Sequence, residues 1–250
     1  MAKSEVQKIT PTFLQGMTDT SLEDMKGYRV LSRIRVVQAM SDATLKEQCG
    51  EGAAVLQPGN VLLSKAKEAF RFVPLFFFPE FITWKDRRDG GSPIYSRSFD
   101  KAGEIAAKSR DSDSRFEPYP GGPNNDPYKF RHVEHLNFAG VIYGGDLHMT
   151  PAAMSFAKGE LGVGKNLCSA ALLRKTPLWS QVWEFYSGTR DAGGYQWWGL
   201  DFKNPDLQPW IQESEADTFK SMHDELKALH DAQKLSVDQS DAKTEEETDF

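Results

Sequence analysis

Residues 70–84 read FRFVPLFFFPEFITW, and this stretch decides the class of fold. Its density of Phe, Val, Ile and Trp favours a β-strand, and Pro74 and Pro79 exclude a long helix. Prolines inside a strand also predict an edge position or a bulge, because proline has no backbone N–H to donate. A polar stretch, KDRRDGGSP, follows, and IYSRSF then returns as a second strand. This part of the chain therefore predicts a β-hairpin.

Further strands and two helices are predicted on either side of this hairpin. The strands are expected within YRVLSRIRVVQAM, KFRHVEHLNFAGVIYG, MSFA, SQVWEFYSG and GYQWWGLDF. A helix is predicted over residues 160–175 and a second, amphipathic one over 206–233. The last twelve of residues 100–128 hold four prolines and two glycines, which predicts a long irregular loop. The sum is a β-rich α+β chain.

Composition excludes several classes of protein. With 250 residues, 39% of them hydrophobic and 12% aromatic, the chain can bury a sizeable core. No stretch approaches the ~18 apolar residues that a membrane span needs, so no membrane partner is expected. The start, MAKSEVQKIT, lacks the apolar region of a secretory signal. Two cysteines, Cys49 and Cys168, form no disulfide framework, and a cytoplasmic location is expected.

The net charge of −6 is unevenly distributed. Residues 211–250 hold four basic and twelve acidic side chains, whereas residues 1–210 hold 26 basic and 24 acidic ones. A mildly basic body therefore carries an acidic C-terminal extension. From the N-terminus, we expect a flexible N-terminal segment (1–25), a binding domain (26–205), a C-terminal helix (206–235) and a disordered acidic tail (236–250).

Two motifs of enzymes have weak support in this chain. GELGVGKN, residues 159–166, satisfies the GxxxxGK pattern of phosphate-binding loops, but Asn166 replaces the Ser or Thr that holds Mg²⁺. A helix packed through small glycines is the better interpretation. His132 and His135 belong to HVEH, and on a strand they point to opposite faces, which is poor geometry for one metal. No enzyme activity, cofactor or metal is therefore expected.

Aromatic and basic residues alternate on several predicted strands and their turns. Aromatic rings stack on unpaired bases, and Lys and Arg neutralise phosphates, so this pattern favours single-stranded nucleic acid. A core position is the competing interpretation for each ring taken alone. The candidate nucleic-acid-binding residues are Trp84, Lys85, Arg87, Arg88, Tyr95, Arg97, Tyr128, Arg131, Lys165 and Trp197.

The last fifteen residues carry six acidic side chains and one lysine, and they end in an aromatic residue. A tail that only adds solubility needs no terminal ring, whereas a peptide that docks on a partner does. The candidate partner-binding residues are Glu245, Glu246, Glu247, Asp249 and Phe250.

The chain resembles the single-stranded DNA-binding proteins of tailed phages that are built on an OB-fold. The resemblance rests on the aromatic β-rich body, the helix near the C-terminus and the ending EEETDF. RFVPLFFFPEFITWKDR and GYQWWGL are also similar to phage proteins found among replication genes. The resemblance implies an OB-fold-like β-barrel, with residues 100–128 and 159–175 as insertions.

The resemblance also implies a function. Such proteins coat single-stranded DNA during replication and recombination, without enzymatic activity, in the host cytoplasm. The acidic tail would compete with DNA for the basic groove and would recruit a polymerase, primase or helicase. A homodimer is possible. Two alternatives remain: a virion or assembly protein whose aromatic surface contacts other chains, and a nucleotide-binding enzyme that uses residues 159–165.

Overall fold

The computed structural model describes residues 30–89 and 94–237. The strands, in chain order, are β1 (Val30–Leu31), β2 (Arg33–Val36), β3 (Ala54–Gln57), β4 (Val61–Ser64), β5 (Ala69–Trp84), β6 (Ile94–Ser98), β7 (Phe116–Tyr119), β8 (Tyr128–Ile142), β9 (Pro151–Ala157), β10 (Trp183–Ala192), β11 (Tyr195–Lys203) and β12 (Ser236–Val237). The helices are α2 (Ala43–Cys49), α3 (Glu104–Arg110), α4 (Leu161–Leu173) and α5 (Ala216–Asp231). The β-rich α+β class is therefore confirmed.

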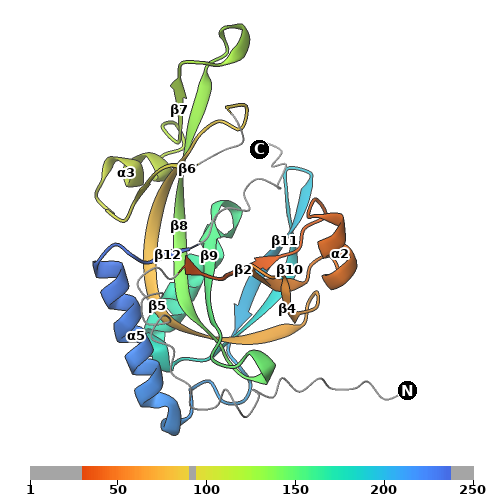
Figure 1. Cartoon of the computed structure of the whole chain (residues 1–250), viewed down its shortest axis with the longest axis vertical. Helices are drawn as coiled ribbons and strands as arrows, with labels where there is room; N and C mark the ends of the chain where they lie inside the picture. The colour runs from red at the N-terminus through yellow and green to blue at the C-terminus, as the bar shows by residue number, and fades with distance from the viewer. Residues whose placement is uncertain (1–29, 90–93, 238–250) are drawn as a thin grey trace, which may run out of the picture.

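Ten strands form one open, mixed sheet (Figure 1). Its path is β11-β10-β5-β8-β9-β2-β3-β4, while β6 joins β5 and β7 joins β8. The pairs are antiparallel except β2 with β9, and a separate parallel pair joins β1 to β12. The sheet is not closed, so the expected OB-fold-like barrel is not confirmed. That barrel needs about five strands of moderate length, whereas β5 and β8 alone have 16 and 15 residues here.

The hairpin expected at residues 70–99 is observed as β5 and β6. β5 is a central strand, but it has a strand on both sides only at its two ends, where β10 pairs with residues 69–72 and β6 with residues 81–84. Pro74 and Pro79 lie between these ends, where β8 is the one neighbouring strand, and a bulge follows Pro74. The missing N–H of each proline therefore interrupts no second ladder.

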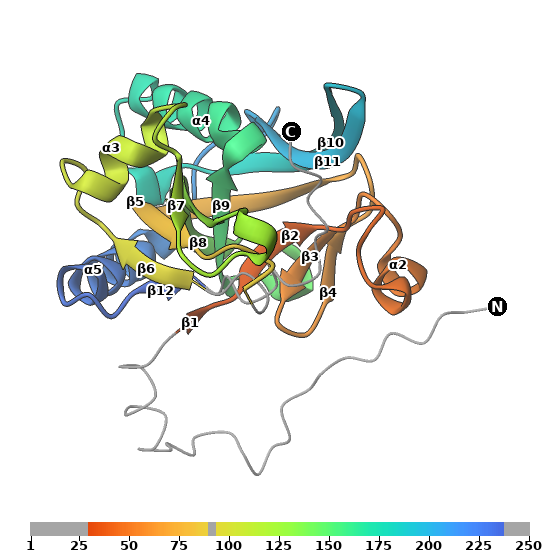
Figure 2. The same cartoon turned by 90° about the horizontal axis from the view of Figure 1, so that it is seen from above.

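Two helices cover opposite faces of the sheet (Figure 2). On one face, Phe72 and Phe138 pack with Leu167 of α4. On the other face, Phe78 packs with Phe219 and Leu226 of α5. Both helices were predicted from the sequence, although α5 begins at Ala216, ten residues later than expected. No helix in the described ranges is long and apolar enough to cross a membrane.

The segment expected to be an irregular loop, residues 100–128, contains regular structure. It holds α3 and β7, and β7 pairs with the start of β8. Together with β6, these elements extend the central strands beyond the rest of the sheet, at the top of Figure 1. We call this extension, made of β6, β7, the end of β5 and the start of β8, the arm.

A substitution at Gly140 tests how closely the central strands pack. It lies opposite Pro74 at the bulge, and an added Cβ would collide with the backbone oxygen of Val73 and lie 2.6 Å from the ring of Phe72. We expect Gly140→Ala to lower the free energy of unfolding by roughly 1–3 kcal/mol, because the core cannot expand. Urea denaturation measures the change.

Gly162→Ala is the matched control for this prediction. Gly162 lies in α4, and an added Cβ there meets nothing within 4 Å. We expect a gain of up to about 1 kcal/mol, because alanine favours the helix. Equal effects of the two substitutions would contradict the proposed close approach at Gly140.

Candidate functional site

Four aromatic rings form a continuous column on the arm. The ring centroids of Tyr95 and Phe130 are 4.6 Å apart, and those of Phe130 and Tyr119 are 4.1 Å apart with an interplanar angle of 20°. The ring of Tyr128 follows at 5.5 Å from that of Tyr119. We call these four residues the aromatic column.

Strand register places the four rings on one face. Residues directly opposite each other in an antiparallel pair point to the same side, and Tyr119 lies opposite Tyr128. Phe130 shares their face because it follows Tyr128 by two positions. Tyr95 comes from β6 at a shift in register, where its neighbours Ile94 and Ser96 pair with consecutive residues of β5. A bulge of this kind re-aims a side chain, and here it brings Tyr95 against Phe130.

The two ends of the column differ in exposure. Tyr95 is 59% exposed, so part of its ring is open to a ligand. At the other end, the guanidinium of Arg88 lies 5.5 Å from the centroid of Tyr128. The hydroxyl of Tyr119 accepts a hydrogen bond from the backbone N–H of Asp86 and donates one to Asp89. The column is thereby fixed to the turn that follows β5.

Arg88 is a clamp within the arm. Its guanidinium makes ion pairs with Asp86 at 2.8 Å and with Asp126 at 2.7 Å. Hydrogen bonds from Arg88 hold the pKa of Asp86 well below its usual range, and the same bonds raise the pKa of Arg88. The two carboxylates thus compensate the charge of Arg88. The sequence predicted that Arg88 contacts phosphates, whereas in the structure it binds these carboxylates. Lys85 also has a carboxylate nearby, Asp89 at 3.6 Å.

The structure corrects the prediction made for Trp84. It was expected on the binding face, but its side chain is 6% exposed and packs with Ile82 and Val133. A ring without an open face cannot stack on a ligand, so Trp84 belongs to the core. Its register partner, Arg131, shares that side of the sheet, whereas the neighbouring Phe130 points to the column side.

A buried histidine, His135, lies on the face opposite the column, within electrostatic reach of four cationic side chains. His135 is fully buried, and burial lowers its pKa to about 3, with a further lowering by the charges of four cations. These cations are Arg33, Lys158, Arg97 and Arg131. The Nδ1 of His135 lies 3.1 Å from the hydroxyl of Ser155, while its Nε2 has no hydrogen-bond partner in the described part of the chain. We call the four cations and His135 the cationic cluster.

Glu80 is a buried carboxylate that lies directly opposite His135 in the sheet. It accepts hydrogen bonds from Arg97 and from Asn137, each at 3.2 Å. Burial raises the pKa of Glu80, and the charge of Arg97 opposes that rise. Arg97 is therefore held between the buried carboxylate and the surface.

The remaining candidates lie elsewhere. Trp197 is a half-buried residue of β11 whose indole N–H donates to Glu160. Lys165 is exposed on α4. The glycines of the GELGVGKN motif serve packing: a Cβ on Gly159 would lie 3.0 Å from Trp197, and one on Gly164 would lie 2.9 Å from Phe156. Two predicted segments lie outside the described residues. They are the flexible N-terminal segment over residues 1–25 and the tail candidates Glu245, Glu246, Glu247, Asp249 and Phe250.

Sequence reasoning missed several members of both groups. Tyr119 was not among the candidates for binding, nor were Arg33 and His135. A signal for Tyr119 was present: FEPY and YKFR alternate on either side of PGGPNND, which is the pattern of a hairpin. The cationic cluster has no local signal, because its residues come from separate strands that are paired only in the folded sheet.

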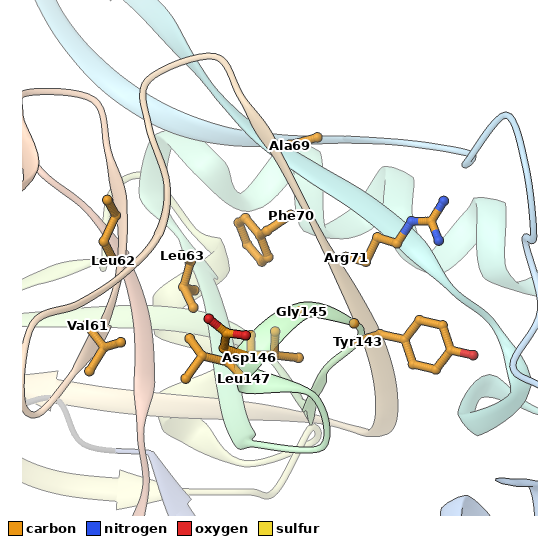
Figure 3. A pocket seen from close by; sticks show the side chains of 12 residues that line it. Val61, Leu62, Leu63, Ala69, Phe70, Arg71, Tyr143, Gly145, Asp146 and Leu147 are labelled. Atoms are coloured by element: carbon orange, nitrogen blue, oxygen red, sulfur yellow. The ribbon is translucent and has the colours of Figure 1, made fainter. Parts of the chain in front are cut away.

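A groove of about 620 Å³ lies between β4, the start of β5 and the turn after β8 (Figure 3). Leu63, Phe70 and Leu147 converge on it, while Arg71 and Tyr143 point away. None of the residues predicted as binding candidates lines this groove. Within residues 30–89 and 94–237, no group of three or more His, Cys, Asp or Glu side chains could hold a metal ion.

The cationic cluster makes stability depend on pH. His135 has a pKa of about 3 in the folded protein and about 6.5 in an unfolded chain. The unfolded state therefore binds the proton first, and stability is lost as the pH falls from about 6.5 toward 3, by up to about 1.4 kcal/mol per pH unit. We expect His135→Asn to flatten this dependence. Urea denaturation of both proteins at pH 7 and pH 5 measures it, and parallel curves would contradict the burial of a neutral His135.

Comparison with known proteins gives one match. No curated protein and no solved structure matches the chain significantly. A family model described as Pam3 phage gp34-like protein matches residues 3–234, which is most of the chain and includes all strands of the sheet. The family points to a phage protein, as the sequence suggested, but it carries no description of an activity. The chain belongs to the Pam3 phage gp34-like protein family.

Proposed function

We propose that the protein binds single-stranded DNA without strong sequence preference and acts, without enzymatic activity, in the replication or recombination of phage DNA in the host cytoplasm. The aromatic column is the observation that carries this proposal. Its four rings are already in contact, with Tyr119 and Phe130 stacked, and the open ring of Tyr95 offers the next position in the column to a base. Stacking on a base is worth about 1–3 kcal/mol and does not depend on its identity.

Two cationic residues come from the turn that anchors the column. Lys85 and Arg87 lie in this turn, which follows β5 and holds the hydroxyl of Tyr119. Lys129 lies between two column residues along β8, so its side chain points to the opposite face. Lys85 and Arg87 can neutralise phosphates beside a stacked base. Duplex DNA hides the faces of its bases, so this arrangement favours single strands.

Tyr95→Ala tests the column directly. We expect it to weaken binding of labelled oligo-dT by roughly 5- to 150-fold, corresponding to one lost stacking contact, with little change in the salt dependence. Phe116→Ala is the control, because Phe116 is an exposed ring of the same arm outside the column. Fluorescence anisotropy at two salt concentrations measures both variants. Equal affinity of the intact protein for oligo-dT and duplex would overturn the proposal.

The acidic C-terminal segment is proposed to regulate this binding. β12 pairs in parallel with β1, so Val237 lies beside Leu31, two residues before Arg33 of the cationic cluster. Residues 238–250 continue from that point with six acidic side chains and one lysine. Tethered so close, the segment has a high effective concentration at the cluster and can compete with phosphates there. Its terminal aromatic residue would bind a replication protein such as a polymerase, primase or helicase.

Truncation after Val237 tests the regulation. This end point keeps β12, whose Val237 is buried, and removes a net charge of −5. We expect tighter binding of oligo-dT, most clearly at low salt, where charge competition is least screened. Deleting Phe250 alone should leave DNA affinity unchanged, because it removes no side-chain charge. Identical affinities of the truncated and intact proteins at low salt would rule out autoinhibition and leave the column untouched as a binding site.

A further inference from the structure

The groove shown in Figure 3 is an apolar surface to which the proposed DNA binding assigns no role. Val61 and Leu63 of β4 line it together with Phe70 of β5 and Leu147 of the turn after β8. Val61 is 42% exposed, so the groove is open to water on that side. A volume of about 620 Å³ admits several side chains at once, because pockets for organic ligands measure ~300–1,000 Å³.

The groove lies at the open edge of the sheet. β4 ends the path of the sheet, and β3 is its pairing partner among the described strands. The sequence of β4, VLLS, has no charge, and both Val61 and Leu62 are exposed. An uncharged apolar edge attracts strands of other molecules, and proteins manage such an edge by covering it with a loop, a helix or charged side chains. A segment that covers β4 is therefore expected.

The chain enters the sheet at the end that holds the groove. β2 runs parallel to β9, and the N–H of Ala153 in β9 donates to the backbone oxygen of Ser32 at 2.7 Å. The strands that follow residue 29 therefore start at the same end of the sheet as β9, which is where the turn after β8 lies. Residues 143–147 of that turn line the groove. The segment of residues 1–29 thus ends close to the groove.

The sequence of that segment contains a short apolar cluster. Residues 11–17 read PTFLQGM, which places Phe13, Leu14 and Met17 within five positions. Twelve residues separate Met17 from Val30. An extended chain spans up to ~3.3–3.6 Å per residue, so this stretch is long enough to cross the end of the sheet and reach β4.

Charge complements the apolar fit. Residues 1–17 carry two lysines and one glutamate, which gives a net side-chain charge of +1. Asp146 is exposed and lines the groove beside Leu147, whereas Arg71, the cation among the lining residues, points away from it (Figure 3). The first part of the segment and the open side of the groove therefore carry opposite charge.

Three observations favour this segment over the acidic C-terminal one. β12 is parallel to β1, so residue 238 leaves at the opposite end of β1 from residue 29. Residues 238–250 carry six acidic side chains, which Asp146 would repel. The family model begins at residue 3 and stops at residue 234, so it includes the N-terminal segment and leaves out the acidic one.

We propose that the N-terminal segment docks in this groove of its own chain, with Phe13 and Leu14 as its apolar anchors. The docked segment covers Val61 and closes the open edge of the sheet at β4. The docking is independent of the proposed DNA binding, because no residue that lines the groove belongs to the aromatic column or to the cationic cluster.

Hydrogen–deuterium exchange of the full chain, measured by mass spectrometry of its peptides, tests the docking from the side of the groove. We expect the backbone amides of residues 12–17 to exchange at least about tenfold more slowly than in a free peptide of the same sequence. Val61→Asp places a charge in the groove and should remove this protection. Val61 is 42% exposed, so we expect the fold to survive, and a thermal melt checks this.

The double variant Phe13→Asp with Leu14→Asp tests the same contact from the side of the segment. It changes no residue of the sheet, and it should speed the exchange of residues 61–64 and 143–147. Phe250→Asp is the matched control, because it also replaces an aromatic residue near a chain end by a charged one. We expect it to leave the exchange of the groove unchanged.

Several outcomes would overturn the proposal. Residues 12–17 that exchange as fast as the free peptide would show no docking, and protection that Val61→Asp leaves unchanged would place the segment elsewhere. A groove that responds to Phe250→Asp but not to the double variant would have the C-terminal segment as its occupant. Protection that rises with protein concentration would mean that the segment docks on a second copy of the chain.

Discussion

The antiparallel pairing of β5 with β8 sets the position of everything else in this protein. It runs from Phe72 opposite Ile142 to Trp84 opposite Arg131, and one bulge after Pro74 corrects the register between them. β5 brings β10 and β6 to its two ends, and β8 brings β9 and β7 to its own. A slip of one residue in this pairing would exchange the two faces along its length. Phenylalanines would then lose the core, and Glu80 would lose its contacts with Arg97 and Asn137.

The same alternation separates the two groups of candidate side chains. Phe130 belongs to the aromatic column and Arg131 to the cationic cluster, and they are neighbours in sequence on opposite faces of β8. Rings and charges that the sequence suggested as one surface are thus two surfaces at one end of the sheet. A nucleic acid that contacts both must pass around the edge of the arm. This geometry suits a flexible single strand and excludes a straight duplex from contacting both surfaces at once.

Much of the fold could be predicted from local patterns. The hairpin at residues 70–99, the hairpin of β10 and β11, and the two main helices all follow from alternation, turn residues and amphipathic spacing. The predictions that were not confirmed depend on pairing between residues far apart in the sequence, which local patterns do not contain. Trp84 looked like a surface ring because cations follow it, and only the pairing with β8 shows that it is buried. Tyr95 reaches the column through a shift in register. The barrel failed because strand count and closure depend on distant pairings.

The short parallel pair of β1 and β12 has a consequence for folding. Leu31 and Val237 meet although 206 positions of sequence separate them, so this contact closes nearly the longest loop that the described chain contains. Loop closure of that length is costly until the intervening strands have already drawn the ends together. We therefore expect the pairing of β1 with β12 to form after the central strands. Leu31 and Val237 are each buried in the same core as Phe78 and Phe219, so this late contact completes that side of the core.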